Sequence, residues 1–386
     1  MRLLHTADWH LGKRLHGIDR LEEAQAVLAE LAELAAAERV DAVLVAGDLL
    51  DRRLIEPQVL AACLRALEDL ASVAPVVAVT GNHDDPAFWA ELAPYLAPRI
   101  AMVAEPGSPD EATVTLETRN GLLHVAALPW PDPGGTPVTA GATVAHAGGL
   151  HLAEVTARID ALDEELRDRR RAAGGATALV AHLMVDRALA GGGERALTLG
   201  SAWAFPGPAL PGGADYVALG HVHRPQGVAG RPGAAYSGSP MALDFSDEGQ
   251  ARGATLVEIG PGGGATRALT AEAGRRLVRI RGRLDELPAL AAEHPDAWFL
   301  CEVELEDAPL DLVREVRERV PDALRVEPVA AASPAVPGPG GGDGPDAADL
   351  GELYAAWRES VGRPADESLV GAFRTALARA ERGGDG

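Results

Sequence analysis

The chain has 386 residues, 47% of them hydrophobic and 4% aromatic, which is enough for two or three domains packed mainly by aliphatic side chains. Its formal net charge of −22 excludes binding of nucleic acid through overall charge, because such binding relies on cations that displace counterions from phosphates. The two cysteines, Cys63 and Cys301, form no motif, which excludes a disulfide-rich scaffold and favours a reducing compartment.

The first residues show no pattern of a targeting segment, because an apolar run begins at Arg2 and a polar motif follows it directly. No apolar run has the length that a membrane-spanning helix needs. We therefore expect a cytoplasmic, nucleoid-associated protein with no membrane partner.

Residues 1 to about 260 alternate short apolar runs with stretches of helical periodicity, which predicts a layered α/β core. The expected strands are 2–4, 44–46, 76–79, 178–180 and 216–219. The expected helices are 21–39, 59–70 and 152–171.

Each expected strand of this region is followed by a motif that contains Asp, His or Asn. These motifs are Asp8-Trp9-His10, Gly47-Asp48 with Asp51, Gly81-Asn82-His83-Asp84, Ala181-His182 and Gly220-His221-Val222-His223. Open α/β folds place their sites where strands end, so we expect these side chains to meet. Oxygen and imidazole donors without cysteine suit a divalent ion such as Mn²⁺ or Fe²⁺ better than structural zinc.

Each motif alone has an ordinary explanation, since Gly-Asp is common in turns and a His-x-His pair is often solvated or part of a core. The joint pattern is harder to explain this way, because five of the eleven histidines lie in these motifs. We interpret the other six as structural or surface residues: His5, His16, His124, His146, His151 and His294.

Three further segments follow the core, which we place at residues 1–265. Residues 275–330 alternate strand and helix in a smaller α+β pattern, with strands at 277–280, 299–303 and 324–326. Residues 331–348 are rich in Pro and Gly and indicate a linker. Residues 349–382 form two amphipathic helices, too short to fold alone, so they either pack back on the body or dock on a partner.

The set D-x-H, G-D-x-x-D, G-N-H-D, H and G-H-x-H resembles the calcineurin-like metallophosphoesterases. The run His5-Thr6-Ala7-Asp8-Trp9-His10-Leu11-Gly12 further resembles the SbcD family of nuclease subunits, as does Tyr236-Ser237-Gly238-Ser239-Pro240. Where that family often carries a Lys after Glu248-Gly249, this chain has Arg252 nearby. The resemblance implies two mixed sheets flanked by helices, a small capping domain over 275–330 and a partner-docking helical tail.

The resemblance also assigns ligands for two divalent metal ions, which we expect to be Mn²⁺. One ion takes Asp8, His10, Asp48 and His223, and the other takes Asp48, Asn82, His182 and His221. Asp48 suits the bridging position because it ends a central strand, and two ions about 3.5–4 Å apart need an anionic bridge. In an extended segment residues i and i+2 point the same way, which would suit His221 with His223 and Asp8 with His10.

Three more residues near the ligands receive roles in this scheme. By the family pattern His83 is not a ligand but contacts the scissile phosphate or protonates the leaving oxygen. Asp84 could orient His83. Asp51 either accepts a hydrogen bond from a ligand histidine or caps a helix N-terminus.

Two basic pairs, Lys13-Arg14 and Arg52-Arg53, follow the first two motifs. Each pair is either a solvated face or a contact to the DNA backbone. Because the net charge is negative, we expect weak intrinsic DNA binding with a partner supplying the rest.

The resemblance thus implies a metal-dependent exonuclease and endonuclease that hydrolyses phosphodiester bonds at DNA ends and hairpins. It would act in DNA repair, recombination and replication as a homodimer within a heterotetramer, joined by its C-terminal helices to an SbcC-like ATPase. The alternatives are a small-molecule phosphodiesterase or phosphatase of the same superfamily and an inactive DNA-binding scaffold.

Overall fold

The structure is a computed structural model that describes residues 1–135, 144–189, 204–250, 252–260, 263–305, 311–330, 358 and 369–373. The chain forms two compact units, Met1–Ala331 and Ala332–Gly386. The expected linker at 331–348 lies outside the described residues. So does the expected helical tail at 349–382, apart from Arg358 and a helical stretch at 369–373.

Two mixed β-sheets make up the described core of the first unit. The first runs in the order β14 (Gly263–Thr270), β13 (Gly253–Gly260), β1 (Arg2–Thr6), β4 (Ala42–Ala46), β5 (Val76–Val79) and β6 (Ile100–Val103). The second runs β11 (Gln226–Gly227), β12 (Ala234–Tyr236), β10 (Tyr216–Gly220), β9 (Ala176–His182), β8 (Gly121–Leu128) and β7 (Thr113–Thr118). The central strands of both sheets are parallel.

The central strands β4, β5 and β10 are apolar along their whole length because both of their faces are covered. Between the sheets lies a core of small and branched aliphatic side chains, including Leu44 and Val77 from the first sheet and Val180 from the second. The low aromatic content is thus compatible with tight packing of the two sheets.

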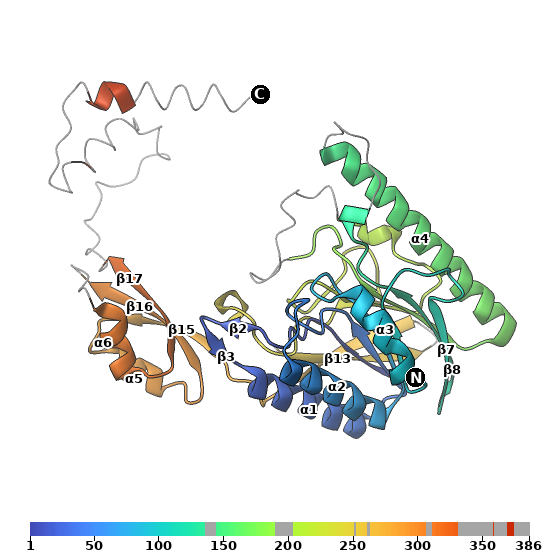
Figure 1. The fold of residues 1–386 in the computed structure, drawn as a ribbon, viewed down its shortest axis with the longest axis horizontal. Coiled ribbons are helices and arrows are strands. Elements are labelled where there is room, and N and C mark those ends of the chain that lie inside the picture. Colours follow the sequence, from blue (N-terminus) through green and yellow to red (C-terminus); the bar gives the residue numbers. More distant parts are fainter. Residues whose placement is uncertain are drawn as a thin grey trace, which may run out of the picture. The chain divides into compact units, whose positions relative to one another are not determined.

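Helices cover the outer faces of both sheets. α1 (Leu21–Glu38), α2 (Pro57–Val73) and α3 (Pro86–Leu96) pack on the first sheet, with α1 and α2 side by side (Figure 1). α4 (Val144–Ala173) packs on the second sheet and begins before the expected residue 152. The pair Gly148-Gly149, which is unfavourable in a helix, lies inside α4, so its start is hard to predict from the sequence. The expected layered α/β core is confirmed. Among the described helices, none is both long and apolar enough to cross a bilayer.

A smaller sheet of three parallel strands follows the core, in the order β15 (Leu277–Gly282), β16 (Trp298–Leu305) and β17 (Ala323–Ala330). α5 (Leu287–Ala292) and α6 (Leu312–Arg319) connect these strands, as the sequence pattern predicts. We call this part the capping sheet. It belongs to the same compact unit as the core.

Short elements complete the described chain: β2 (Arg14–Leu15), β3 (Ile18–Asp19), η1 (Pro133–Gly135), η3 (Gly207–Ala209) and η4 (Phe245–Asp247). The carboxyl ends of β1, β4, β5, β9 and β10 lead into the five polar motifs. The parallel topology therefore brings these motifs together at one edge of the paired sheets.

Candidate metal centre

The motif residues lie at the last positions of the strands, as His182 does in β9, or in the turns that follow the strands. Four of them have a left-handed backbone, with φ of 56° at Asp8, 47° at His10, 53° at Asp48 and 101° at His221. The expectation of extended geometry at Asp8–His10 and His221–His223 is therefore wrong. Left-handed non-glycine residues cost of order 1–3 kcal/mol each and cluster at functional sites, so these turns serve to aim side chains.

Two glycines of the motifs permit the strand ends to approach closely. A Cβ at Gly81 would lie 2.1 Å from Oδ1 of Asp48, and a Cβ at Gly220 would lie 1.9 Å from the carbonyl oxygen of Ala46. Any side chain at either position would push apart the turns that carry the polar residues.

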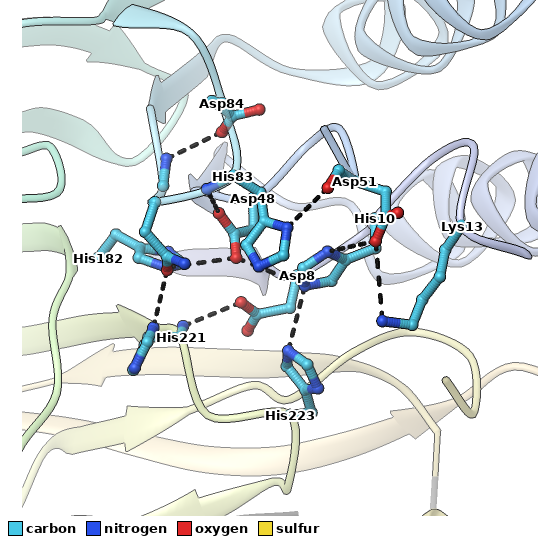
Figure 2. Close-up of polar contacts among 12 residues, drawn as sticks. Asp8, His10, Lys13, Asp48, Asp51, His83, Asp84, His182, His221 and His223 are labelled. Carbon is cyan, nitrogen blue, oxygen red and sulfur yellow. Dashed lines mark hydrogen bonds and ion pairs between the residues drawn. The ribbon is translucent and has the colours of Figure 1, made fainter. Parts of the chain in front are cut away.

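The carboxylate of Asp48 lies at the centre of the cluster (Figure 2). Its Oδ1 accepts a hydrogen bond of 2.8 Å from the backbone N–H of His83. Its Oδ2 lies 3.4 Å from Nε2 of His10 and 3.6 Å from Nε2 of His182. One oxygen of Asp48 thus faces imidazoles that come from two different sheets.

On one side of Asp48, Nε2 of His10 and Nε2 of His223 lie 3.1 Å apart. Asp8, His10 and His223 offer ligand atoms within 4.8 Å of one another, and all three residues are buried. Oδ1 of Asp8 also accepts the backbone N–H of His221 at 2.9 Å, which ties the first motif to the last (Figure 2).

On the other side, Oδ1 of Asn82 lies 3.0 Å from Nε2 of His182 and 2.9 Å from Nδ1 of His221. Nδ1 of His182 lies 2.8 Å from the carbonyl oxygen of Ala46, which can only accept a hydrogen bond. Nδ1 therefore carries the proton, and Nε2 of His182 keeps a lone pair directed at the cluster.

The electrostatics of the cluster favour metal ligation. Burial lowers the pKa of His182 and lowers that of His221 to about 3, and it also lowers the pKa of His223. Burial opposes ionisation of Asp48, but the surrounding imidazoles and the His83 N–H bring its pKa below the ordinary value. Neutral imidazoles beside ionised carboxylates are the form in which these side chains bind metal ions.

Asp51 contacts both His83 and His10. Nδ1 of His83 lies 2.7 Å from the carbonyl oxygen of Asp51, and Nδ1 of His10 lies 3.5 Å from the Asp51 carboxylate. Burial opposes ionisation of Asp51, but the hydrogen bond from His10 and the charges of His10, Lys13 and His83 together outweigh it and lower the pKa. Asp51 is not a helix cap, because the N-cap position of α2 is Glu56.

Asp84 fastens two turns to each other. Its carboxylate accepts hydrogen bonds from the backbone N–H groups of Gly81 at 2.8 Å, Leu50 at 3.1 Å and Leu49 at 3.3 Å. Burial, and after it the charge of Asp48, raises the pKa of Asp84 to about 7. The structure therefore directs this carboxylate at the backbone around Asp48, whereas the ring of His83 pairs with Asp51.

Two further residues contact the cluster. Trp130 was not singled out from the sequence, and Arg252 was noted there without a role. The indole of Trp130, just after β8, stacks on His221 with ring centroids 5.0 Å apart and meets His182 edge-on at 5.8 Å. Arg252 donates from Nη1 to the carbonyl oxygen of His223 at 2.8 Å. The signal for Trp130 was its place directly after a strand, as with the other motifs.

The basic pairs lie at the rim of the cluster. Nζ of Lys13 is 3.7 Å from Oδ1 of Asp51, and the guanidinium of Arg52 is 4.0 Å from its Oδ2. Arg14 pairs loosely with Asp19 at 3.9 Å, and Arg53 is exposed. Of the six remaining histidines, His5, His124 and His151 are buried, and His5 and His124 lie at hydrogen-bond distance from the hydroxyls of Tyr216 and Thr115.

The donor set fits divalent metal ions. Carboxylates, one amide oxygen and imidazoles converge without a described cysteine, and Nε2 of His10 lies within hydrogen-bond distance of Nε2 of His223. Structural zinc sites favour cysteine, which is not among the described side chains of this cluster.

Comparison with known proteins places the chain in a family. A family model described as calcineurin-like phosphoesterase matches residues 1–225, and one described as type 5 capsule protein repressor C-terminal domain matches residues 273–339. The chain belongs to the calcineurin-like phosphoesterase family, whose members use divalent metals.

Curated relatives narrow this assignment. The SbcD subunit of nuclease SbcCD from Bacillus subtilis is 32% identical over 357 residues, covering 85% of this chain and 86% of that protein. The SbcD subunits from Rhodobacter capsulatus and Escherichia coli K12 are 32% and 28% identical, covering 86% and 85% of this chain and 86% and 84% of their own lengths. Within the phosphoesterases, the chain belongs to the SbcD family.

Proposed function

We propose that this protein is a metal-dependent nuclease that hydrolyses phosphodiester bonds at DNA ends and hairpins, acting with an SbcC-like ATPase in DNA repair and recombination. The relatives named as SbcD subunits of nuclease SbcCD, which match about 85% of the chain, support this proposal. The observation that carries the chemistry is the position of Asp48, whose Oδ2 faces His10 and His182 together.

Two ions, which we propose to be Mn²⁺, are held by the converging side chains. Asp48 bridges them. One ion takes Asp8, His10 and His223, in line with the 3.1 Å approach of the two imidazoles. The other takes Asn82, His182 and His221, in line with the shared approach to the Asn82 oxygen.

When bound, such a pair of ions activates water and stabilises charge on the attacking and leaving oxygens. Besides holding the ions, the chain contributes His83 as the proton donor to the leaving oxygen. Because the Asp51 carbonyl accepts a hydrogen bond from Nδ1–H, Nε2 is the atom from which His83, protonated at both ring nitrogens, would give a proton to the leaving oxygen. Asp51 and Asp84 position the ligands through the contacts described above.

DNA reaches this centre past the rim of basic side chains. Lys13, Arg14, Arg52 and Arg53 contact backbone phosphates in this proposal, and the side chains of Arg14 and Arg52 are 56% and 57% exposed. Such contacts position the strand without reading its sequence.

The proposed domain boundaries follow the sequence pattern. Residues 1–265 form the nuclease domain, 275–330 the capping domain, 331–348 a linker and 349–382 a tail that docks on the ATPase. The protein works in the cytoplasm, at the nucleoid, as a homodimer within a heterotetramer.

The test is cleavage of single-stranded DNA by the purified chain with Mn²⁺, beside cleavage of a small phosphodiester. We expect Mn²⁺-dependent DNA cleavage that stops after chelation and dialysis and returns when Mn²⁺ is added. Hydrolysis of the small phosphodiester without DNA cleavage would favour a small-molecule enzyme. Metal binding without hydrolysis of either substrate would indicate a scaffold.

A further inference from the structure

The backbone of His223 is held by two donors from another part of the chain. Its carbonyl oxygen accepts the Ser239 N–H at 3.1 Å and Nη1 of Arg252 at 2.8 Å. A carbonyl with two donors cannot rotate freely, so the peptide that carries the His223 ring has one orientation. Arg252 is therefore placed to determine where this imidazole points.

Arg252 is itself fixed by a buried ion pair with Asp247. Its Nη2 lies 2.9 Å from Oδ1 of Asp247, whose side chain is fully buried, while that of Arg252 is 10% exposed. The other carboxylate oxygen of Asp247 accepts the backbone N–H groups of Leu243 at 2.9 Å and Asp244 at 3.2 Å. This buried charge pair is costly to break, because loss of either partner leaves an uncompensated charge.

The residues on either side of Asp247 contact the capping sheet. Phe245 is buried in a cluster with Leu277, Leu300 and Leu324 of that sheet. Glu248 accepts the backbone N–H of Arg279 in β15 at 2.7 Å. The η4 turn is thus bonded on one side to the capping sheet and on the other, through Arg252, to His223.

We infer that the Asp247–Arg252 pair is a positioning device that couples the placement of the capping sheet to the ligand geometry of His223. It rests on the proposed role of His223 as a metal ligand. A shift of β15 would move Glu248 and Phe245, then the adjoining Asp247, and with it the guanidinium that holds the His223 carbonyl. The capping sheet thereby adjusts the affinity of one metal position, that of His10 and His223, from outside the cluster.

The experiment is titration of the metal-free full-length chain with Mn²⁺ alone. Binding is measured by calorimetry and by the electron paramagnetic resonance of free Mn²⁺. Arg252→Gln should weaken one of two binding steps by roughly 10–100-fold, the usual effect of losing a partner that orients a ligand. Arg252→Lys, which keeps a cation near Asp247, should restore most of the affinity. Glu248→Ala, on the capping side, should weaken the same step by a smaller factor.

Glu304→Gln is the matched control, because Glu304 pairs with Arg281 at 2.9 Å on the capping sheet and should leave both steps unchanged. Wild-type affinities in Arg252→Gln, or equal weakening of both steps, would overturn the inference alone. If Arg252→Gln does not fold, wild-type affinities in Glu248→Ala would overturn the coupling. A wild-type chain that binds no Mn²⁺ would overturn the proposed function and this inference together.

Discussion

Nδ1 of His83 lies 2.7 Å from the backbone carbonyl oxygen of Asp51. Because a carbonyl only accepts, this contact fixes the tautomer of His83 and leaves Nε2 as the atom for proton exchange. The same residue, Asp51, holds His10 through its carboxylate. One turn after β4 thus orients both a proposed ligand and the proposed proton donor.

His83→Gln should bind both metal ions normally but cleave DNA roughly 10²–10⁴-fold more slowly, the usual contribution of a positioned proton donor. The deficit should shrink on a nitrophenyl phosphodiester, because nitrophenolate departs without a proton. Steady-state rates on both substrates, with metal content measured on the same samples, check this prediction.

Two results would assign His83 a different role. An equal deficit on both substrates with full metal content would indicate charge stabilisation or phosphate positioning. Reduced metal content would make His83 a ligand, in line with the closeness of His10, Asp48 and His83 ligand atoms.

Asp48→Asn and Asp8→Asn should differ in metal binding. Asp48 faces imidazoles on both sides, so its loss of charge should weaken both ions, whereas Asp8→Asn should chiefly affect the ion near His10 and His223. Titration with Mn²⁺ gives the two affinities of each variant. Equal, partial losses in both variants would show that Asp48 does not bridge.

Asp51→Asn should lower the affinity of one ion by about 10–100-fold, because the amide holds the Nδ1 proton of His10 less strongly than the carboxylate does. Asp19→Asn is the matched control, since Asp19 is exposed and pairs with Arg14 at 3.9 Å. Calorimetric titration with Mn²⁺ measures both variants. Unchanged affinity in Asp51→Asn would limit Asp51 to its backbone contact with His83.

The stability of the metal-free protein should fall as the pH drops below about 6.5. Burial lowers the pKa of His5 to about 3, so between these values the unfolded chain binds a proton that the folded chain does not. That difference destabilises the fold by roughly 1.4 kcal/mol per pH unit. Denaturant unfolding at pH 7.0 and 5.5 measures the effect.

His5→Asn should show a smaller loss between these two pH values, although it also loses the 2.8 Å contact between Nδ1 of His5 and the Tyr216 hydroxyl. His16→Asn, at an exposed position, should keep the wild-type loss. An identical pH dependence in His5→Asn and the wild type would show that His5 does not contribute.

The sequence predicted the five core strands that lead into the motifs, β1, β4, β5, β9 and β10, and the convergence of these motifs, because both follow from apolar periodicity and from the rule that parallel strands end at one edge. It did not predict the left-handed turns at Asp8 and His221, since a local pattern does not reveal a conformation that tertiary contacts impose. The role of Asp84 was equally hidden, because two of its three partners are backbone groups of a turn more than thirty residues away.

Trp130 and Arg252 show the same limit. Each contacts a proposed ligand histidine that lies far along the sequence, and neither has a side chain of the metal-ligating kind that marked the motifs. Arg252 stood out through the family resemblance alone, and its partner atom, a backbone carbonyl, has no sequence signature. Interactions that orient ligands are therefore harder to predict than the ligands themselves.

Trp130→Ala should weaken the ion held by His182 and His221, because the indole stacks on one ring and meets the other edge-on. An aromatic pair contributes about 0.5–1.5 kcal/mol, so we expect a loss of roughly 2–10-fold in one of the two Mn²⁺ affinities. Trp130→Phe keeps a stacking ring and should lose less. Tyr95→Ala, at a site where the tyrosine is 84% exposed, should change neither affinity. Weakening of the other ion instead, or equal losses in the Phe and Ala variants, would contradict a role for the stacked indole in holding His221.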